Sequence, residues 1–148
     1  MTTNFLFSRT KDAQDLPLPS RATPHSAGMD LHANIHEDIL LKPGKCERIP
    51  TGICTAMPPG YEAQIRPRSG LAYKYGVTML NAPGTIDADY RGEIHAILIN
   101  LGDEPYIIRR GDRIAQMVIA SVVLTEFTEV DDLPDSIRGK GGFGHSGV

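Results

Sequence analysis

The sequence predicts an all-β fold with one short helix, and three observations support this. Short apolar runs recur through the middle of the chain. Eleven prolines and fifteen glycines separate these runs. No segment has the sustained periodicity of a long amphipathic helix. Strands bounded by turn residues at this spacing are typical of a β-sandwich, a jelly roll or a barrel.

The expected strands follow one another from residue 39 onward. They comprise residues 39–41, 49–56, 61–65, 77–80, 93–100, 106–108 and 114–123. Turn sequences in which glycine adjoins proline or aspartate punctuate them, at residues 42–45, 58–60, 101–104 and 110–112. Ser69 is the expected N-cap of a short helix over residues 71–75, and Gly76 is expected to end it.

Length and charge narrow the class of protein. A chain of 148 residues is expected to form one β domain, residues 1–137, followed by a C-terminal arm, residues 138–148. The net charge of −3 argues against a nucleic-acid partner, and no apolar run approaches the roughly 20 residues that span a membrane. Two cysteines give no disulfide framework. We therefore expect a cytoplasmic protein, with a nuclear or organellar location open for a eukaryotic source.

The C-terminal arm has an unusual composition. Residues 138–148 hold two cations, one aromatic ring and five glycines, and such a segment cannot bury enough surface to order itself. Its cations suit phosphate groups and Phe143 suits stacking on a planar ring. A flexible glycine-rich tail without a ligand is the alternative. The acidic stretch before the arm is interpreted as a solvated connector.

Five polar clusters interrupt the strand pattern. They are residues 27–31, 67–72, 81–94, 111–117 and the arm itself. Taken singly, each also has a structural interpretation; Asp87 with Asp89, for example, could form a solvated loop. Together, in this order and spacing, they resemble the homotrimeric deoxyuridine triphosphate nucleotidohydrolases (dUTPases). The resemblance runs from about Ser26 to Gly147, and the segment Gly84-Thr-Ile-Asp-Ala-Asp-Tyr-Arg-Gly92 is specific on its own.

The resemblance implies a β jelly roll in which three chains share three active sites. It also implies Mg²⁺-dependent hydrolysis of dUTP to dUMP and pyrophosphate. The corresponding physiological role is to limit uracil incorporation into DNA and to supply dUMP for dTTP synthesis. The expected partners are dUTP and two further copies of the chain.

Asp87 matches the catalytic carboxylate of the family. It would hold and polarise the water that attacks the α-phosphate, and a carboxylate suits that role because it accepts hydrogen bonds. Tyr90 would lie against the deoxyribose, where a ribose 2′-hydroxyl would find no polar partner. A turn aspartate and a tyrosine packed in the core are the alternatives.

Uracil recognition is expected from the hairpin between Asn81 and Tyr90. Asn81 matches the side-chain contact to the base, and an amide offers both a donor and an acceptor. The backbone of Gly84, Thr85 and Ile86 would present further N–H and C=O groups. The alternative for Asn81 is a turn residue without a ligand.

The phosphates are expected to meet the second and fourth clusters. Ser69 and Gly70 match the phosphate-binding loop, and Gln116 would contact phosphate directly or through water. Arg68 would either approach the phosphates or structure the loop by pairing with an acid. Gln116, as a strand residue with an inward amide, otherwise needs a buried partner.

Magnesium would come mainly with the substrate, because Mg²⁺ keeps several waters and prefers phosphate oxygens. Asp30 is the expected acceptor from a metal-bound water. The five histidines show no paired ligand spacing, so a zinc site is not expected.

Within the arm, Arg138 matches the residue that binds the γ-phosphate, and Phe143 the ring that stacks on uracil. Gly144 and Ser146 would add contacts. Two positions depart from the family pattern: His145 stands where serine is usual, and Lys140 where serine or threonine is common. One hydroxyl contact to phosphate is therefore in question, and a histidine N–H would replace it with a mild pH dependence.

Two other functions stay open at this level. A dCTP deaminase of the same fold would need a carboxylate at the exocyclic amine, for which Glu93 is the nearby candidate. A jelly-roll binding module that keeps nucleotide affinity but signals to a protein partner is the other. The presence of Asp87, Tyr90, Ser69 and Phe143 together argues against the binding module.

Overall fold

The computed structural model describes residues 4–144 and confirms the all-β jelly-roll class. Within this range it contains eleven strands, one α-helix and one 3₁₀ turn. The strands are β1 (Leu6–Arg9), β2 (Gly28–His32), β3 (Ile39–Leu41), β4 (Cys46–Pro50), β5 (Ile53–Ala56), β6 (Tyr61–Arg66), β7 (Val77–Met79), β8 (Gly84–Ile86), β9 (His95–Asn100), β10 (Tyr106–Ile108) and β11 (Arg113–Ser121). The helix is α1 (Ser69–Tyr75) and the 3₁₀ turn is η1 (Lys11–Ala13).

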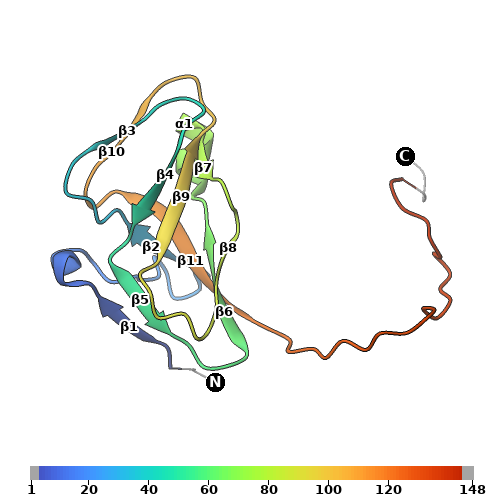
Figure 1. Ribbon diagram of the computed structural model, residues 1–148. Coiled ribbons are helices and arrows are strands. Elements are labelled where there is room, and N and C mark those ends of the chain that lie inside the picture. The colour runs from blue at the N-terminus through green and yellow to red at the C-terminus, as the bar shows by residue number, and fades with distance from the viewer. Residues whose placement is uncertain (1–3, 145–148) are drawn as a thin grey trace.

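The strands pair antiparallel in four sheets. A four-stranded sheet has the order β2-β11-β6-β8 and a three-stranded sheet the order β4-β9-β7. Two-stranded sheets, β3 with β10 and β1 with β5, lie at opposite ends of the molecule, and α1 lies at the β3–β10 end (Figure 1). Buried side chains from both larger sheets, among them Leu31, Ile65, Met117, Ile49 and Leu98, join in one apolar cluster.

Most expected strands are present, but the run at residues 49–56 is two strands. Gly52 has a φ of +70°, in the left-handed region, so the chain turns a corner there. β4 then pairs with β9, and β5 pairs with β1. Three strands were not expected: β1, β2 and β8. The last two lie in polar clusters because one face of each meets solvent or a cavity.

The helix begins two residues earlier than the expected start at residue 71, and its N-cap lies one residue earlier than expected. Ser69 is its first residue, Arg68 occupies the N-cap position, and no side chain caps the helix there, so the predicted Ser69 cap is wrong. Arg68 is extended, and its carbonyl accepts the N–H of Ala72 at 3.1 Å. Gly76 ends the helix as expected, with a φ of 68° that favours glycine.

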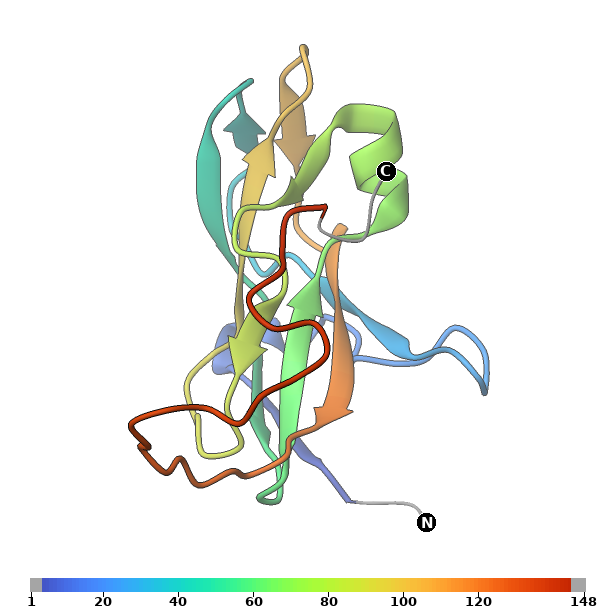
Figure 2. The ribbon, with the colours of Figure 1, turned by 90° about the vertical axis from the view of Figure 1, so that its right-hand side faces the viewer.

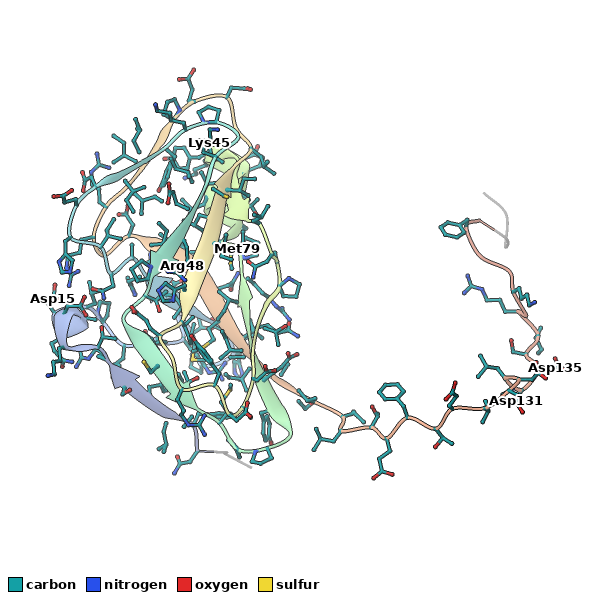
Figure 3. The ribbon with its side chains drawn as sticks, viewed as in Figure 1. Asp15, Lys45, Arg48, Met79, Asp131 and Asp135 are labelled. Atoms are coloured by element: carbon teal, nitrogen blue, oxygen red, sulfur yellow. The ribbon has the colours of Figure 1, made fainter. Side chains whose placement is uncertain are left out.

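Residues 122–144 lie outside the sheets. After β11 the chain runs away from the strands, and Asp131 and Asp135 lie on this extended segment far from the body (Figures 1 and 3). In the perpendicular view the segment passes in front of β6 and β8 (Figure 2). Phe127 and Phe143 on this segment are almost fully exposed. No helix within residues 4–144 is long and apolar enough to cross a membrane.

Candidate active site

Four of the residues predicted to meet phosphate lie around one cavity. Arg68, Ser69 and Gly70 come from the loop that enters α1, and Gln116 comes from β11. The cavity has a volume of about 460 Å³. Asp30 on β2, predicted to face a metal-bound water, lines it as well. We call this the phosphate-side cavity.

The Asp30 carboxylate holds two arginine side chains of this cavity, Arg68 and Arg113, in place. Its Oδ1 accepts a hydrogen bond from Arg68 Nε at 3.0 Å, and its Oδ2 accepts one from Arg113 Nη1 at 3.3 Å. Of the two alternatives for Arg68, the structure therefore shows the pairing with an acid. Arg68 Nη1 also donates to the Arg113 carbonyl at 3.3 Å, so the two guanidinium groups are held side by side. Two cations against one carboxylate leave this wall of the cavity electropositive.

Arg113 was not among the predicted site residues. The signal that could have found it is register: Arg113 lies opposite His32 at the end of β11, and Gln116 lies opposite Asp30. Side chains at these positions share one face of the sheet. Burial lowers the pKa of His32, Arg113 and Arg68 lower it further, and Asp30 opposes the shift. His32 is therefore neutral at pH 7 and adds no charge to this face.

The Gln116 amide has a partner in a partly buried position. Its Nε2 donates to the Pro67 carbonyl at 3.0 Å, which fastens β11 to the loop before α1. The amide lies directly over Gly28, where a Cβ would come within 2.1 Å of Gln116 Oε1. Glycine at residue 28 thus makes room for the Gln116 side chain.

The predicted base-binding hairpin is built on β8. Thr85 pairs with Gln64 of β6, and Gly84, which is buried, pairs with Ile65. The Asn81 amide lies close above Gly84, since a Cβ at residue 84 would be 3.3 Å from Asn81 Nδ2. Asn81 is in a turn, as its alternative interpretation required, and its amide still faces the hairpin.

Asp87 and Tyr90 bound a tight turn that follows β8. The Tyr90 N–H donates to the Asp87 carbonyl at 3.1 Å, and Arg91 Nη1 donates to the Ala88 carbonyl at 2.7 Å. Tyr90 is 43% exposed, which excludes the core-packing alternative. Its hydroxyl donates to the Glu93 carbonyl at 3.0 Å. Asp87 itself is exposed at the start of the turn.

The structure does not bring all predicted residues together. Asp87 lines two cavities, one with Tyr90, Thr85 and Ile86 and one with residues of β6 and of the segment that follows β11. Among the described residues, neither cavity shares a lining residue with the phosphate-side cavity. Within one chain, the predicted catalytic carboxylate and the predicted phosphate loop are thus on separate surfaces.

The predicted arm residues lie apart from both surfaces. Arg138 Nε donates to the Gly141 carbonyl at 2.8 Å, which makes a local turn in the arm. Phe143 and Gly144 are exposed. His145 and Ser146 lie outside the described residues.

Glu93, the candidate acid for a deaminase, is already engaged. Its Oε1 accepts the Gly52 N–H at 2.7 Å, and its Oε2 lies 3.9 Å from His95 Nε2. A carboxylate that holds a backbone N–H is a poor acid for an exocyclic amine, so the structure disfavours the deaminase alternative.

A metal ion would have to be held largely by its substrate. Within residues 4–144, no three His, Cys, Asp or Glu side chains converge as a metal site. Asp30 is the one carboxylate in the described lining of the phosphate-side cavity, and both its oxygens already accept arginine hydrogen bonds. A carboxylate can still accept from a water. These residues fit Mg²⁺ that keeps its waters and binds phosphate oxygens, and they do not fit a carboxylate cage.

Comparison with known proteins identifies relatives along nearly the whole chain. The dUTPase family model matches residues 14–147. A deoxyuridine 5′-triphosphate nucleotidohydrolase from Caldanaerobacter subterraneus subsp. tengcongensis is 58% identical over 140 residues, which cover 95% of each chain. A protein of the same name from Ehrlichia canis is 57% identical over 139 residues, covering 93% of this chain and 91% of the relative.

Solved structures show the same fold. The dUTPase of Staphylococcus bacteriophage 80alpha with dUpNHpp matches with a TM-score of 0.84 at 27% identity, covering 99% of this chain and all of the phage chain. A dUTPase variant from phage phi11 of S. aureus, whose structure concerns the coordination of a structural Mg(II) ion, matches with a TM-score of 0.79. At 22% identity over 89% of this chain and 99% of that one, it supports the fold alone.

Proposed function

The chain belongs to the dUTPase family, and from this membership we propose that it hydrolyses dUTP to dUMP and pyrophosphate. The supporting observation is the combination of two surfaces on one chain. One is a cavity lined by Arg68, Ser69 and Gly70. The other is an exposed carboxylate, Asp87, on a hydrogen-bonded turn. Hydrolysis at the α-phosphate needs a held water and charge compensation on the leaving group, and these surfaces supply one each.

Asp87 acts on the attacking water. Its carboxylate accepts a proton from the water as the new bond to the α-phosphorus forms and the bond to the α,β-bridging oxygen breaks. General-base assistance of this kind contributes about 10²–10⁴-fold. The leaving pyrophosphate takes the bridging oxygen and its electron pair.

The phosphate-side cavity receives the departing charge. Ser69 and Gly70 begin α1, so their N–H groups have no carbonyl one helical turn earlier to bind and can face an anion. Arg68 and Arg113 supply positive charge at fixed positions through Asp30. Gln116, tied to Pro67, lines the same cavity and can contact phosphate through its amide oxygen by way of a water.

Magnesium, when bound with the nucleotide, neutralises phosphate charge and stabilises the leaving pyrophosphate. Asp30 is the residue of this cavity that would accept from one of its waters. The Mg²⁺ dependence of this chain is part of the proposal.

Substrate selection follows from the hairpin. The backbone of Gly84, Thr85 and Ile86, with the Asn81 amide, pairs with the base edge; cytosine reverses the donor and acceptor at two positions and leaves groups unpaired. A ribose 2′-hydroxyl against the Tyr90 ring loses its hydrogen bonds, at roughly 1–3 kcal/mol.

We also propose a homotrimer in which different chains complete each site. Asp87 and the phosphate-side cavity lie on separate surfaces of one chain. The segment 122–144 leaves its own body with its large apolar side chains exposed, and these are Val122, Val123, Leu124, Phe127, Val130, Leu133, Ile137 and Phe143. Exposed apolar side chains in such number mark a surface that binds a protein. The bacterial relatives and the two free cysteines, Cys46 and Cys54, support a cytoplasmic location.

The test is pyrophosphate release from dUTP, dCTP, dTTP and UTP under one set of conditions, with and without Mg²⁺. The proposal expects rapid release from dUTP and at most slow release from the other three. Deamination of dCTP would support the deaminase instead. Nucleotide binding without any turnover would support a binding module.

A further inference from the structure

The Glu93 side chain links the segment that follows the Asp87–Tyr90 turn to the corner at Gly52, which is distant in the sequence. Its side chain is only 25% exposed, and its Oε1 accepts the Gly52 N–H at 2.7 Å. A hydrogen bond between a carboxylate and a backbone N–H is stronger than one between neutral groups. Residues 41 positions apart in the sequence are thereby fastened together.

The corner at Gly52 needs this acceptor. Gly52 lies between β4 and β5, which belong to different sheets, so the corner interrupts the strand pairing on either side of it. On either side of it the backbone pairs with Ile94: the Thr51 N–H donates to the Ile94 carbonyl at 3.1 Å, and the Ile94 N–H donates to the Ile53 carbonyl at 2.8 Å. The Glu93 carboxylate supplies the one acceptor that this ladder otherwise lacks, because an unpaired N–H at such a place is costly.

The backbone of the same residue holds Tyr90. The Glu93 carbonyl accepts the Tyr90 hydroxyl at 3.0 Å and lies 3.0 Å from His95 Nδ1. That nitrogen carries a proton, because a carbonyl oxygen only accepts. The Tyr90 ring folds back over Gly92, where a Cβ would come within 2.6 Å of the ring atom Cζ. The ring orientation thus depends on where the Glu93 carbonyl lies.

We infer that Glu93 is a positioning residue: by holding the Gly52 N–H it fixes the carbonyl that orients Tyr90, and so sets the discrimination against a ribose 2′-hydroxyl. The inference rests on the proposed function, since Tyr90 is taken to face the sugar. The inference requires a side chain long enough for its oxygen to accept the Gly52 N–H, and it does not require that side chain to be charged. Glutamine offers an acceptor oxygen at the same reach, whereas aspartate keeps the charge but withdraws it by about 1.5 Å, one carbon–carbon bond.

The experiment compares Glu93→Gln with Glu93→Asp, using Glu47→Ala, at an exposed residue of β4, as a control for loss of a surface carboxylate. For each protein, kcat and KM are measured with dUTP and with UTP. Hydrogen exchange of the Gly52 amide is followed by NMR, and this readout does not depend on activity. Circular dichroism confirms that each variant is folded.

The expected result is that Glu93→Gln and Glu47→Ala keep both the wild-type ratio of kcat/KM for dUTP over UTP and the protection of the Gly52 amide. Glu93→Asp loses that protection, and its dUTP-over-UTP ratio falls by about fivefold or more, the low end for an unsatisfied polar group. Equal ratios in both Glu93 variants, or a loss in Glu93→Gln that Glu93→Asp escapes, would overturn the inference. If the wild-type protein did not hydrolyse dUTP, the proposed function itself would fail, and the amide protection would still report the contact.

Discussion

The carboxylates of the two candidate surfaces differ in what their oxygens already bind. Glu93 accepts a backbone N–H and Asp30 accepts two arginines. Asp87 is exposed, and within residues 4–144 no hydrogen bond or ion pair engages its carboxylate. A carboxylate that is engaged at both oxygens can position its neighbours but is poorly suited to take a proton from water. Asp87 has the freedom that general-base catalysis requires.

This difference predicts the effect of Asp87→Asn. The amide has nearly the same shape but cannot take a proton from water, so kcat for dUTP should fall by about 10²-fold or more while nucleotide binding persists. Asp89→Asn, in the same exposed turn, is the matched control and should stay within about twofold of wild type. Rates by pyrophosphate release and affinity by calorimetry with a non-hydrolysable analogue check both. Wild-type turnover by Asp87→Asn would remove Asp87 from the water-binding role.

At the scale of residues, the sequence grouped the side chains that lie around one cavity, but it did not identify the partner of each. The grouping of Arg68, Ser69, Gly70 and Gln116 followed from their polar clusters. The Asp30–Arg113 pair did not, because it depends on the register of β2 against β11, which spans 83 positions in the sequence. The hydrogen bond from the Gly52 N–H to Glu93 could not be predicted for the same reason, because it joins residues 41 positions apart in the sequence.

Among the elements, the N-terminal segment is fastened by one side chain. Arg110, in the turn before β11, donates to Asp15 Oδ1 at 2.7 Å, to the Asp12 carbonyl at 2.6 Å and to Asn34 Oδ1 at 2.8 Å. Five hydrogen bonds from one guanidinium tie η1 to the loop after β2. Only the rigid fork of arginine can meet acceptors in this arrangement.

These hydrogen bonds of Arg110 predict that the free energy of unfolding falls at acid pH. The hydrogen bond from Arg110 lowers the pKa of Asp15 below its usual 3.8. A carboxyl with a lowered pKa stabilises the folded state above pH 3.8, and that contribution is lost as the pH falls through the lowered value. Asp15→Asn should therefore reduce stability at pH 6 and flatten its decline below pH 3.8. Urea unfolding midpoints between about pH 2 and 6 measure this. Asp103→Asn, at an exposed loop, is the control and should decline in parallel with wild type.

Strands that are apolar at most positions could be predicted from the sequence, and strands whose outward residues are polar could not. β9 has buried residues at every second position, from Ala96 to Asn100, and was expected almost in full. β2 and β8 alternate as well, but their outward residues line cavities and turns, so they resembled loops. The division of the expected strand 49–56 at Gly52 could not be predicted either, because a corner between two sheets requires only one residue with positive φ.

For the whole molecule, we predict that the arm, residues 138–148, acts as a lid on which the fold of its own body does not depend. Residues 122–144 contain no helix or strand, and their described side chains are exposed. Deleting residues 138–148 should leave the melting temperature within about a degree or two, because the described part of the arm, residues 138–144, has no buried side chain. Activity should fall by about 10²-fold, the effect of leaving the nucleotide poorly held and open to solvent. Scanning calorimetry and pyrophosphate release check the two parts, and a folded, fully active truncation would contradict the role of the arm.

The assembly can be tested by complementation, because a trimer allows one chain to supply what another lacks. Asp87→Asn chains keep the arm, and chains without residues 138–148 keep Asp87. If hairpin and arm come from different chains, random mixing gives about a quarter of the sites an intact copy of both. If both come from one chain, no site has both and the mixture stays inactive. The two proteins are unfolded together, refolded and assayed beside each refolded alone, with sedimentation confirming the trimer. Recovery near a quarter of wild-type activity would show that the arm crosses to a neighbour, whereas trimers that form and stay inactive would place each site within one chain and its own arm.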